Sequence, residues 1–157
     1  MGESLSLEER VRRLEDIEAI KNLTATCALY INKGWNGEEF NGEDLPALFA
    51  EDASWKNEHL EVHVQGREAI VAMLREASEN AEFVMQSFAN PVIDVTGDTA
   101  AGSWLLWAAV KVEGAVDELY QSAELDYARA ADGWRITAVS LNYGASMNSQ
   151  ADPWPGA

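Results

Sequence analysis

The first third of the chain has apolar positions spaced as in an α-helix. Between Leu7 and Gly34 they recur at steps of three or four residues, or a double step, which is the period of one helix face. Ser6 and Glu9 have the spacing of a capping box, and Gly34 suits the helix end. We predict one long helix whose inward residues are Leu7, Val11, Leu14, Ile17, Leu23, Cys27 and Ile31.

Three shorter elements are predicted next. "LPALFA" (45–50) indicates a short helix, and "REAIVAMLREASEN" (67–80) indicates a third helix. The stretch "ASWKNEHLEVHVQG" (53–66) between them reads as a short hairpin. In the third helix the residues expected to face inward are Ile70, Met73, Leu74 and Ala77.

Everything after about residue 82 has the pattern of long strands separated by tight turns. Helices followed by a strand meander predict an α+β fold, with three N-terminal helices packed on a strongly curved antiparallel sheet that forms a cone-shaped barrel. The expected strands are "FVMQSFANPVIDV" (83–95), "TAAGSWLLWAAVKVEG" (99–114), "DELYQSAELDYARA" (117–130) and "WRITAVSLNYG" (134–144).

The length of 157 residues and a hydrophobic content of 47% predict a single domain, 1–157. We expect residues 1–5 and 146–157 to be peripheral tails, the second docked by Trp154. No apolar run reaches 18 residues and no export signal is recognisable, so we predict a cytoplasmic protein. The single Cys27 excludes an internal disulfide and a multi-cysteine metal site.

The charge balance limits the partners. With 27 acidic and 11 basic residues the net charge is −16, which disfavours binding to nucleic acid or to membranes. Dinucleotides would need basic groups that are scarce here, and no glycine-rich phosphate loop is present. We therefore expect a small, neutral or apolar ligand, with no cofactor and no metal.

Five segments occur in an order that resembles one protein family. They are "LEERVRRLEDIEAIKNL", "ALFAEDASW", "VQGREAIVAML", "FANPVIDVTGDTAAGSW" and "YARAADGWRI". The chain is similar, over roughly residues 5–145, to the SnoaL-like branch of the nuclear-transport-factor-2-like superfamily. The resemblance implies the cystatin-like α+β fold. It implies no single activity, because the superfamily includes cyclases, dehydratases, isomerases, hydrolases and dehydrochlorinases.

The resemblance also points to particular positions. In the branch members most similar in layout, bile acid 7α-dehydratases and hexachlorocyclohexane dehydrochlorinase, an Asp and a His abstract a proton without a cofactor. The corresponding positions here are Asn32 and Gln86, and a helix position that is Lys or Tyr in those enzymes is Cys27. Neither amide can act as a base near neutral pH. The resemblance thus implies that Gln86 faces a cavity, with the usual dyad replaced.

Other groups could carry the chemistry, and each has two interpretations. Tyr30 could donate to an oxyanion or be a core aromatic. His63 faces either the cavity or solvent, and its setting favours solvent. Glu124 and Asp126 share one strand face. If these two carboxylates point inward, they would be general acids or bases with raised pKa values. If they point outward, which the acidic composition favours, they would be solvated.

Aromatic residues are expected to line the cone. We assign a substrate-binding role to Cys27, Trp35, Trp55, Phe88, Trp107, Tyr143, His63 and Asp126. Trp104 and Trp107 must face opposite sides of one strand, so one aromatic is left on the outer face of the sheet. An exposed aromatic outer face predicts a homodimer or homotrimer.

Three functional hypotheses follow. The first is a cofactor-independent lyase, isomerase or cyclase acting on a small hydrophobic cyclic molecule, polarised by Asn32, Gln86 and Tyr30. The second is a non-catalytic small-molecule-binding protein of the same fold. The third is an assembly subunit comparable to the β-subunit of ring-hydroxylating dioxygenases.

Overall fold

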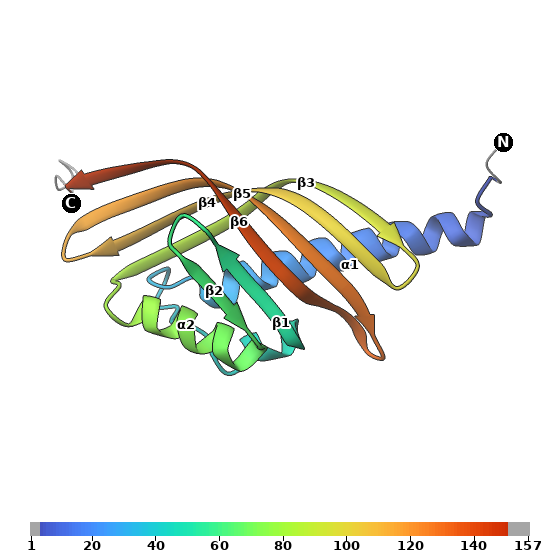
Figure 1. Cartoon of the computed structure of the whole chain (residues 1–157), viewed down its shortest axis with the longest axis horizontal. Coiled ribbons are helices and arrows are strands. Elements are labelled where there is room, and N and C mark those ends of the chain that lie inside the picture. The colour runs from blue at the N-terminus through green and yellow to red at the C-terminus, as the bar shows by residue number, and fades with distance from the viewer. Residues whose placement is uncertain (1–3, 151–157) are drawn as a thin grey trace.

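The computed structural model describes residues 4–150, which form an α+β fold built on one sheet (Figure 1). A long helix comes first, a short hairpin and a second helix follow, and four long strands occupy the rest of the described residues. The elements are α1 (Leu7–Ile31), the 3₁₀ turn η1 (Leu45–Leu48), β1 (Phe49–Asn57), β2 (Val62–Gln65), α2 (Arg67–Glu79), β3 (Phe83–Thr96), β4 (Thr99–Val112), β5 (Ala115–Ala130) and β6 (Gly133–Gln150).

The sheet has six strands in the order β2-β1-β6-β5-β4-β3. The meander β3–β6 is antiparallel throughout and the hairpin β1–β2 is present, as predicted. However, β1 pairs with β6 in parallel, with Trp55 opposite Val139, so the prediction of an antiparallel sheet is wrong at this pair. No hairpin connects β1 to β6, and the alternation pattern contains no information on the direction of such a distant pair.

The described residues contain two α-helices rather than the three predicted. The third expected helix is only the η1 turn, because strand β1 already begins at Phe49 and leaves room for a single turn after Pro46. Both α-helices lie on the same side of the sheet (Figure 1). Within residues 4–150, no helix therefore covers the opposite face of β3–β6.

The helix α1 begins at the predicted capping box, in which Glu9 N–H donates to Ser6 Oγ at 3.2 Å and Ser6 N–H donates to the Glu9 carboxylate at 2.8 Å. Its first turns extend beyond the sheet (Figure 1). The predicted inward residues Leu7, Val11 and Leu14 are therefore exposed, with relative accessibilities of 74%, 45% and 67%. The residues of α1 that are buried are Asp16, Ile20, Thr24, Cys27, Ala28 and Ile31.

Two smaller expectations also change. In α2, Ile70 and Leu74 are buried as predicted, but Val71 and Ser78 complete the buried face, and Ala77 is exposed. Strand β6 continues to Gln150, so residues 146–150 belong to the sheet and not to the predicted tail. Trp154 lies outside the described residues.

Candidate functional site

The end of α1 is joined to β3 by three hydrogen bonds. Asn32 is the C-cap of α1, and its Oδ1 accepts a hydrogen bond of 2.7 Å from the backbone N–H of Gln86. The neighbouring Lys33 exchanges two backbone hydrogen bonds with Val84, of 2.9 and 3.0 Å. The two amide residues singled out in the sequence, far apart in the chain, are thus in direct contact.

The side chain of Gln86 contains a polar atom with no partner. Gln86 lies opposite Ala108 of β4, on the face of the sheet where Ala108 is buried. Its Oε1 is buried and accepts no hydrogen bond from any residue in the described part of the chain. Leaving such an acceptor unsatisfied costs about 1–3 kcal/mol.

The three side chains at the positions that the family resemblance singled out, Cys27, Asn32 and Gln86, are uncharged near neutral pH. Asn32 and Gln86 are amides and do not titrate. Cys27, one of the predicted binding residues, is buried at 2% accessibility, and burial raises the pKa of its thiol to about 12. A thiol held protonated is not a nucleophile. These three side chains can therefore donate and accept hydrogen bonds but cannot abstract a proton.

The interior between α1 and the sheet contains a hydrogen-bond chain that the sequence analysis did not find. Trp104 Nε1–H donates to the Tyr127 hydroxyl at 3.1 Å, which lies 2.8 Å from Thr24 Oγ1. The Thr24 hydroxyl proton is used on Ile20 O at 2.9 Å, so Tyr127 donates to Thr24. Burial raises the pKa of Tyr127 to about 12. In the sequence, the only signal for this hydrogen-bond chain was the period-two alternation of the strands that contain Trp104 and Tyr127.

Three of the predicted aromatics belong to or border the core. Trp55 is buried and its ring centroid lies 6.5 Å from that of Phe49. Phe88 is half-buried and packs edge-on against Trp104, with centroids 6.0 Å apart. Tyr30 is half-buried against the same core, and its carbonyl accepts from Asn41 N–H. Of these, Phe88 is two residues from Gln86 on the same strand.

The other predicted side chains are spread over the surface. Trp35 is exposed and contacts Phe83, with centroids 5.2 Å apart. His63 is exposed while its neighbours in β2 are half-buried, so it faces solvent. Tyr143 is exposed and stacks on His59, with centroids 3.7 Å apart. His63 and Tyr143 thus lie on the surface, whereas Trp35 contacts β3 next to the backbone pairing of Lys33 with Val84.

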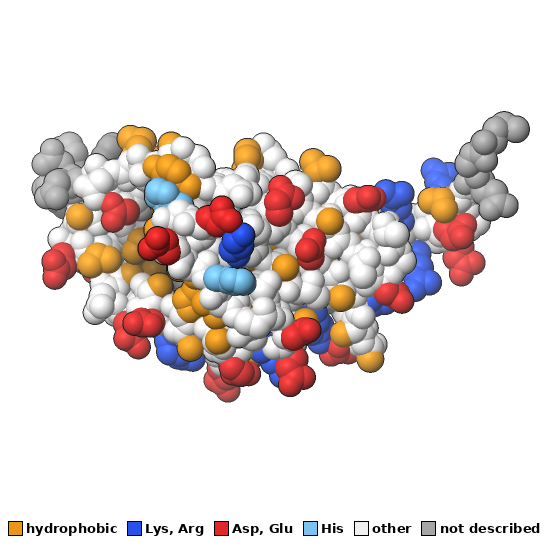
Figure 2. All heavy atoms as spheres, viewed as in Figure 1, with side chains coloured by type: hydrophobic (Ala, Val, Ile, Leu, Met, Phe, Trp, Pro, Cys, Tyr) orange, Lys and Arg blue, Asp and Glu red, His pale blue; other side chains and the backbone are white. Residues whose placement is uncertain are grey.

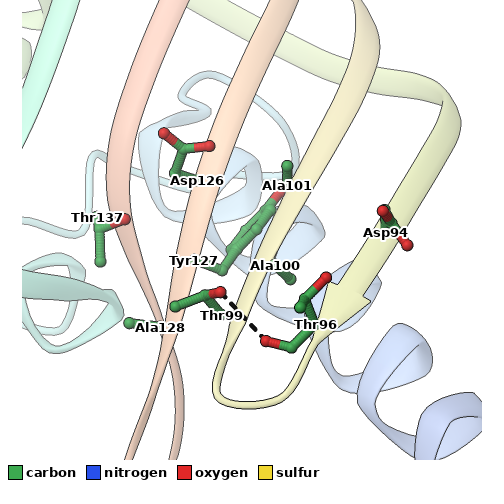
Figure 3. A pocket seen from close by; sticks show the side chains of 9 residues that line it. All are labelled: Asp94, Thr96, Thr99, Ala100, Ala101, Asp126, Tyr127, Ala128 and Thr137. Carbon is green, nitrogen blue, oxygen red and sulfur yellow. Dashed lines mark hydrogen bonds between the residues drawn. The ribbon is translucent and has the colours of Figure 1, made fainter.

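Trp107 and Asp126 lie on the outer face of the sheet. Trp107 is 46% exposed, whereas Trp104 on the alternate face is 5% exposed. Asp126 lies opposite Ala101 of β4, next to a hollow of about 510 Å³ that also includes Asp94 (Figure 3). At the rim of this hollow, Thr99 Oγ1 donates to Thr96 O at 3.2 Å (Figure 3). The structure separates both predicted residues from the Asn32–Gln86 contact.

Among the surface hollows formed by the described residues, four have volumes of about 510, 540, 540 and 690 Å³. Neither Asn32 nor Gln86 lines any of these four. Within residues 4–150, no cluster of three or more His, Cys, Asp or Glu residues has a geometry suited to a metal ion. In the same range, neither α-helix combines the length and the hydropathy needed to cross a bilayer.

The fold is that of the cystatin-like, nuclear-transport-factor-2-like proteins. Hexachlorocyclohexane dehydrochlorinase LinA type 2 superposes with a TM-score of 0.78 at 15% identity, covering 94% of this chain and 99% of that one. A Novosphingobium aromaticivorans protein with a provisional scytalone dehydratase assignment gives 0.76 at 18% identity, covering 92% and 97%. A cystatin-like protein of the same organism gives 0.72 at 22%, covering 90% and 92%.

The sequence itself places the chain more narrowly. The profile of the SnoaL-like domain matches residues 12–140, and the chain therefore belongs to the SnoaL-like family. No curated protein sequence matches the chain. Since identities to the solved structures are below 25%, the structural likeness establishes the fold and not the reaction.

Proposed function

We propose that the chain binds a small, mainly apolar molecule between α1 and the sheet, oriented by hydrogen bonds at Asn32 and Gln86. The observation that supports this is the buried, unpartnered Oε1 of Gln86. A buried acceptor without a partner destabilises the folded state unless something supplies a donor. A ligand hydroxyl or N–H would do so.

The ligand we propose is neutral. A net charge of −16 repels anions, and the neutral Asn32–Gln86 pair offers no charge with which to bind an ion. The proposal includes the cone-shaped enclosure expected from the sequence, a cytoplasmic location, and binding without a cofactor. Phe88, half-buried and two residues along β3, would supply apolar contact.

The role of Gln86 can be tested with two naphthalene probes of similar shape. We expect 2-naphthol, which has a hydroxyl donor, to quench tryptophan fluorescence on binding, and Gln86→Leu to weaken that binding about fivefold, the effect of one neutral hydrogen bond. 2-Methoxynaphthalene, which has no donor, should bind both forms alike. Equal binding of 2-naphthol by the two forms would overturn the proposal.

A second candidate is a dehydratase-like lyase, isomerase or cyclase that polarises its substrate with Asn32, Gln86 and Tyr30. It is favoured by solved structures of the same fold that are named as a dehydrochlorinase and, provisionally, a dehydratase. One amide or phenol donor at a developing oxyanion is worth about 3 kcal/mol.

Exchange of the α-protons of 2-tetralone in D₂O, followed by proton NMR, separates the two candidates. Catalysis predicts exchange above the buffer rate that is lost in Gln86→Leu, and a hidden carboxylate base would add a titration between about pH 4 and 7. Exchange at the buffer rate would exclude this enzymatic candidate for such ketones and leave the binding function.

A further inference from the structure

The interior of the fold contains a second pair of amide side chains. Asn57 on β1 and Gln121 on β5 are 4% and 8% exposed, and they are 64 residues apart in the chain. Asn57 Nδ2–H donates to Gln121 Oε1 at 3.4 Å. A buried amide is costly unless its polar atoms have partners, so this pair calls for an explanation. We call Asn57 and Gln121 the second amide pair.

The strand register places Gln121 on the same face of the sheet as Gln86. Leu106 on β4 is 1% exposed and lies opposite Phe88 of β3 and opposite Gln121 of β5. Directly opposite side chains share a face, and so do residues two apart on one strand, such as Phe88 and Gln86. Gln86 and Gln121 therefore both lie on the buried face.

The two glutamines are separated by one strand with apolar side chains. Strand β4 lies between β3 and β5, and neighbouring strands are about 4.8 Å apart, so the lateral separation is about 10 Å. On β4, the buried Ala108 lies opposite Gln86. The buried Leu106 lies opposite Gln121. A rigid molecule of two fused rings with a polar group at each end has about this length.

The hydrogen-bonding groups that the two glutamines offer are complementary. Asn57 Oδ1 accepts from Leu60 N–H at 3.2 Å, so it is the Nδ2 group of Asn57 that meets the carbonyl oxygen of Gln121. The Nε2–H₂ group of Gln121 donates no hydrogen bond to any residue in the range 4–150. At Gln86 the atom without a partner is the acceptor Oε1. One end of the interior thus offers an acceptor and the other end a donor.

Neither amide pair can neutralise an ion. Acidic side chains are distributed over the face of the molecule that Figure 2 shows, whereas the side chains of both pairs are amides. An ionised group between the pairs would be buried without a counter-charge, which is costly. A ligand that contacts both ends therefore has neutral polar groups.

We propose that Gln121 is a second ligand contact, and that the ligand is a neutral, rigid, mainly apolar molecule with a hydroxyl or N–H at one end and a carbonyl oxygen at the other. Gln86 Oε1 accepts from the hydroxyl, and Gln121 Nε2–H donates to the carbonyl. Asn57 is a positioning residue, because its hydrogen bond holds the Gln121 amide with Nε2 free. This inference rests on the proposed function, since it uses the same site between α1 and the sheet.

The test uses two probes that share a naphthol and differ only at the far end. 6-Acetyl-2-naphthol has a carbonyl there, and 6-isopropyl-2-naphthol has a methyl group in place of the carbonyl oxygen. Isothermal titration calorimetry measures both dissociation constants. We expect Gln121→Leu to weaken binding of the acetyl probe about fivefold, the effect of one neutral hydrogen bond, and to leave binding of the isopropyl probe unchanged. Gln86→Leu should weaken binding of both probes equally, because both keep the hydroxyl.

Two further variants control for changes in folding. Ser122→Ala alters the neighbouring position on β5, whose side chain points to the other face, and should change neither dissociation constant. Gln121→Met keeps the length of the side chain without the amide, and should reproduce the selective loss. Binding of the isopropyl probe itself reports that the ligand site is intact in each variant.

The outcomes separate this inference from the proposed function. If Gln86→Leu weakens both probes but Gln121→Leu and Gln121→Met affect the two probes alike, the second contact is refuted and the ligand site at Gln86 stands. If Gln86→Leu weakens neither probe, or the wild type binds neither, the proposed function fails and this inference fails with it.

Discussion

The guanidinium group of Arg129 on β5 binds both carboxylate oxygens of Asp16 on α1, at 2.7 and 2.8 Å. Trp134 Nε1–H donates a third hydrogen bond to the same carboxylate at 3.0 Å, and the guanidinium lies 4.5 Å from the Trp134 ring centroid. Asp16 is buried at 8% accessibility. These contacts attach α1 to the sheet just after the turns whose apolar side chains are exposed.

The first prediction concerns this ion pair. Asp16→Asn removes the charge that Arg129 and Trp134 bind, and we expect the free energy of unfolding to fall by about 2–3 kcal/mol in urea denaturation. The matched control is Asp98→Asn. Asp98 also binds Arg129, at 2.9 Å, but its side chain is 78% exposed, so the loss should stay below about 1 kcal/mol. Equal losses in the two variants would show that burial of Asp16 does not matter.

The second prediction concerns acid. The hydrogen bonds from Arg129 hold the pKa of Asp16 below its usual value of 3.8. A carboxyl whose pKa is lower in the folded chain stabilises it fully above about pH 4, and this contribution is lost as the pH falls through the folded-state pKa. The difference in unfolding free energy between wild type and Asp16→Asn should therefore shrink below pH 4. A constant difference down to pH 2 would contradict the assignment.

The third prediction concerns the buried hydrogen-bond chain. Tyr127→Phe leaves Trp104 Nε1 without its acceptor, and should lower the free energy of unfolding by about 1–3 kcal/mol in chemical denaturation. Tyr120→Phe is the control, because the Tyr120 hydroxyl is on the surface and should contribute about 0.5 kcal/mol or less. In an ultraviolet titration, Tyr127 should ionise near its pKa of about 12 as long as the fold persists.

The fourth prediction concerns the turn that follows α1. Gly34 has φ +89°, and a Cβ there would lie 2.7 Å from the carbonyl oxygen of Glu82, next to β3. Gly37 has φ +80° but nothing within 4 Å of the corresponding position. Gly37→Ala therefore measures backbone strain alone, about 1 kcal/mol. Gly34→Ala adds a clash with backbone and should lower the melting temperature clearly more; similar melting temperatures would mean that the close approach is relieved without cost.

The sequence predicted the elements whose pattern is local. The capping box at Ser6 and the β3–β6 meander are local features, and both are present. The prediction that the first turns of α1 face inward was wrong, because the helical period identifies an apolar stripe but not where the sheet ends. Leu7 is apolar but exposed. Asp16 is charged but buried, because it pairs with Arg129, which comes 113 residues later in the chain. Nothing local in the sequence indicates that pairing.

The site was predictable only in part, for a related reason. The family resemblance aligned Asn32 and Gln86 with positions that act together, and they are in contact. The contact itself uses the backbone N–H of Gln86, which no side-chain pattern indicates. For Trp107, strand alternation separates it from Trp104 but does not say which of the two faces α1. That choice depends on packing against Tyr127 and Thr24, residues distant in sequence.

The last prediction restores titrating groups at the amide positions. In Gln86→His, burial without a counter-charge should lower the pKa of the new imidazole below about 6.5. In the double variant Asn32→Asp with Gln86→His, the carboxylate should raise that pKa again, because Asn32 Oδ1 lies 2.7 Å from the backbone nitrogen of residue 86. Proton NMR titration of the histidine Cε1–H resonances measures both values, with the exposed His63 as the internal reference. If the new histidine titrates and exchanges like His63 in both variants, position 86 faces bulk water, and the proposed ligand site between α1 and the sheet is wrong.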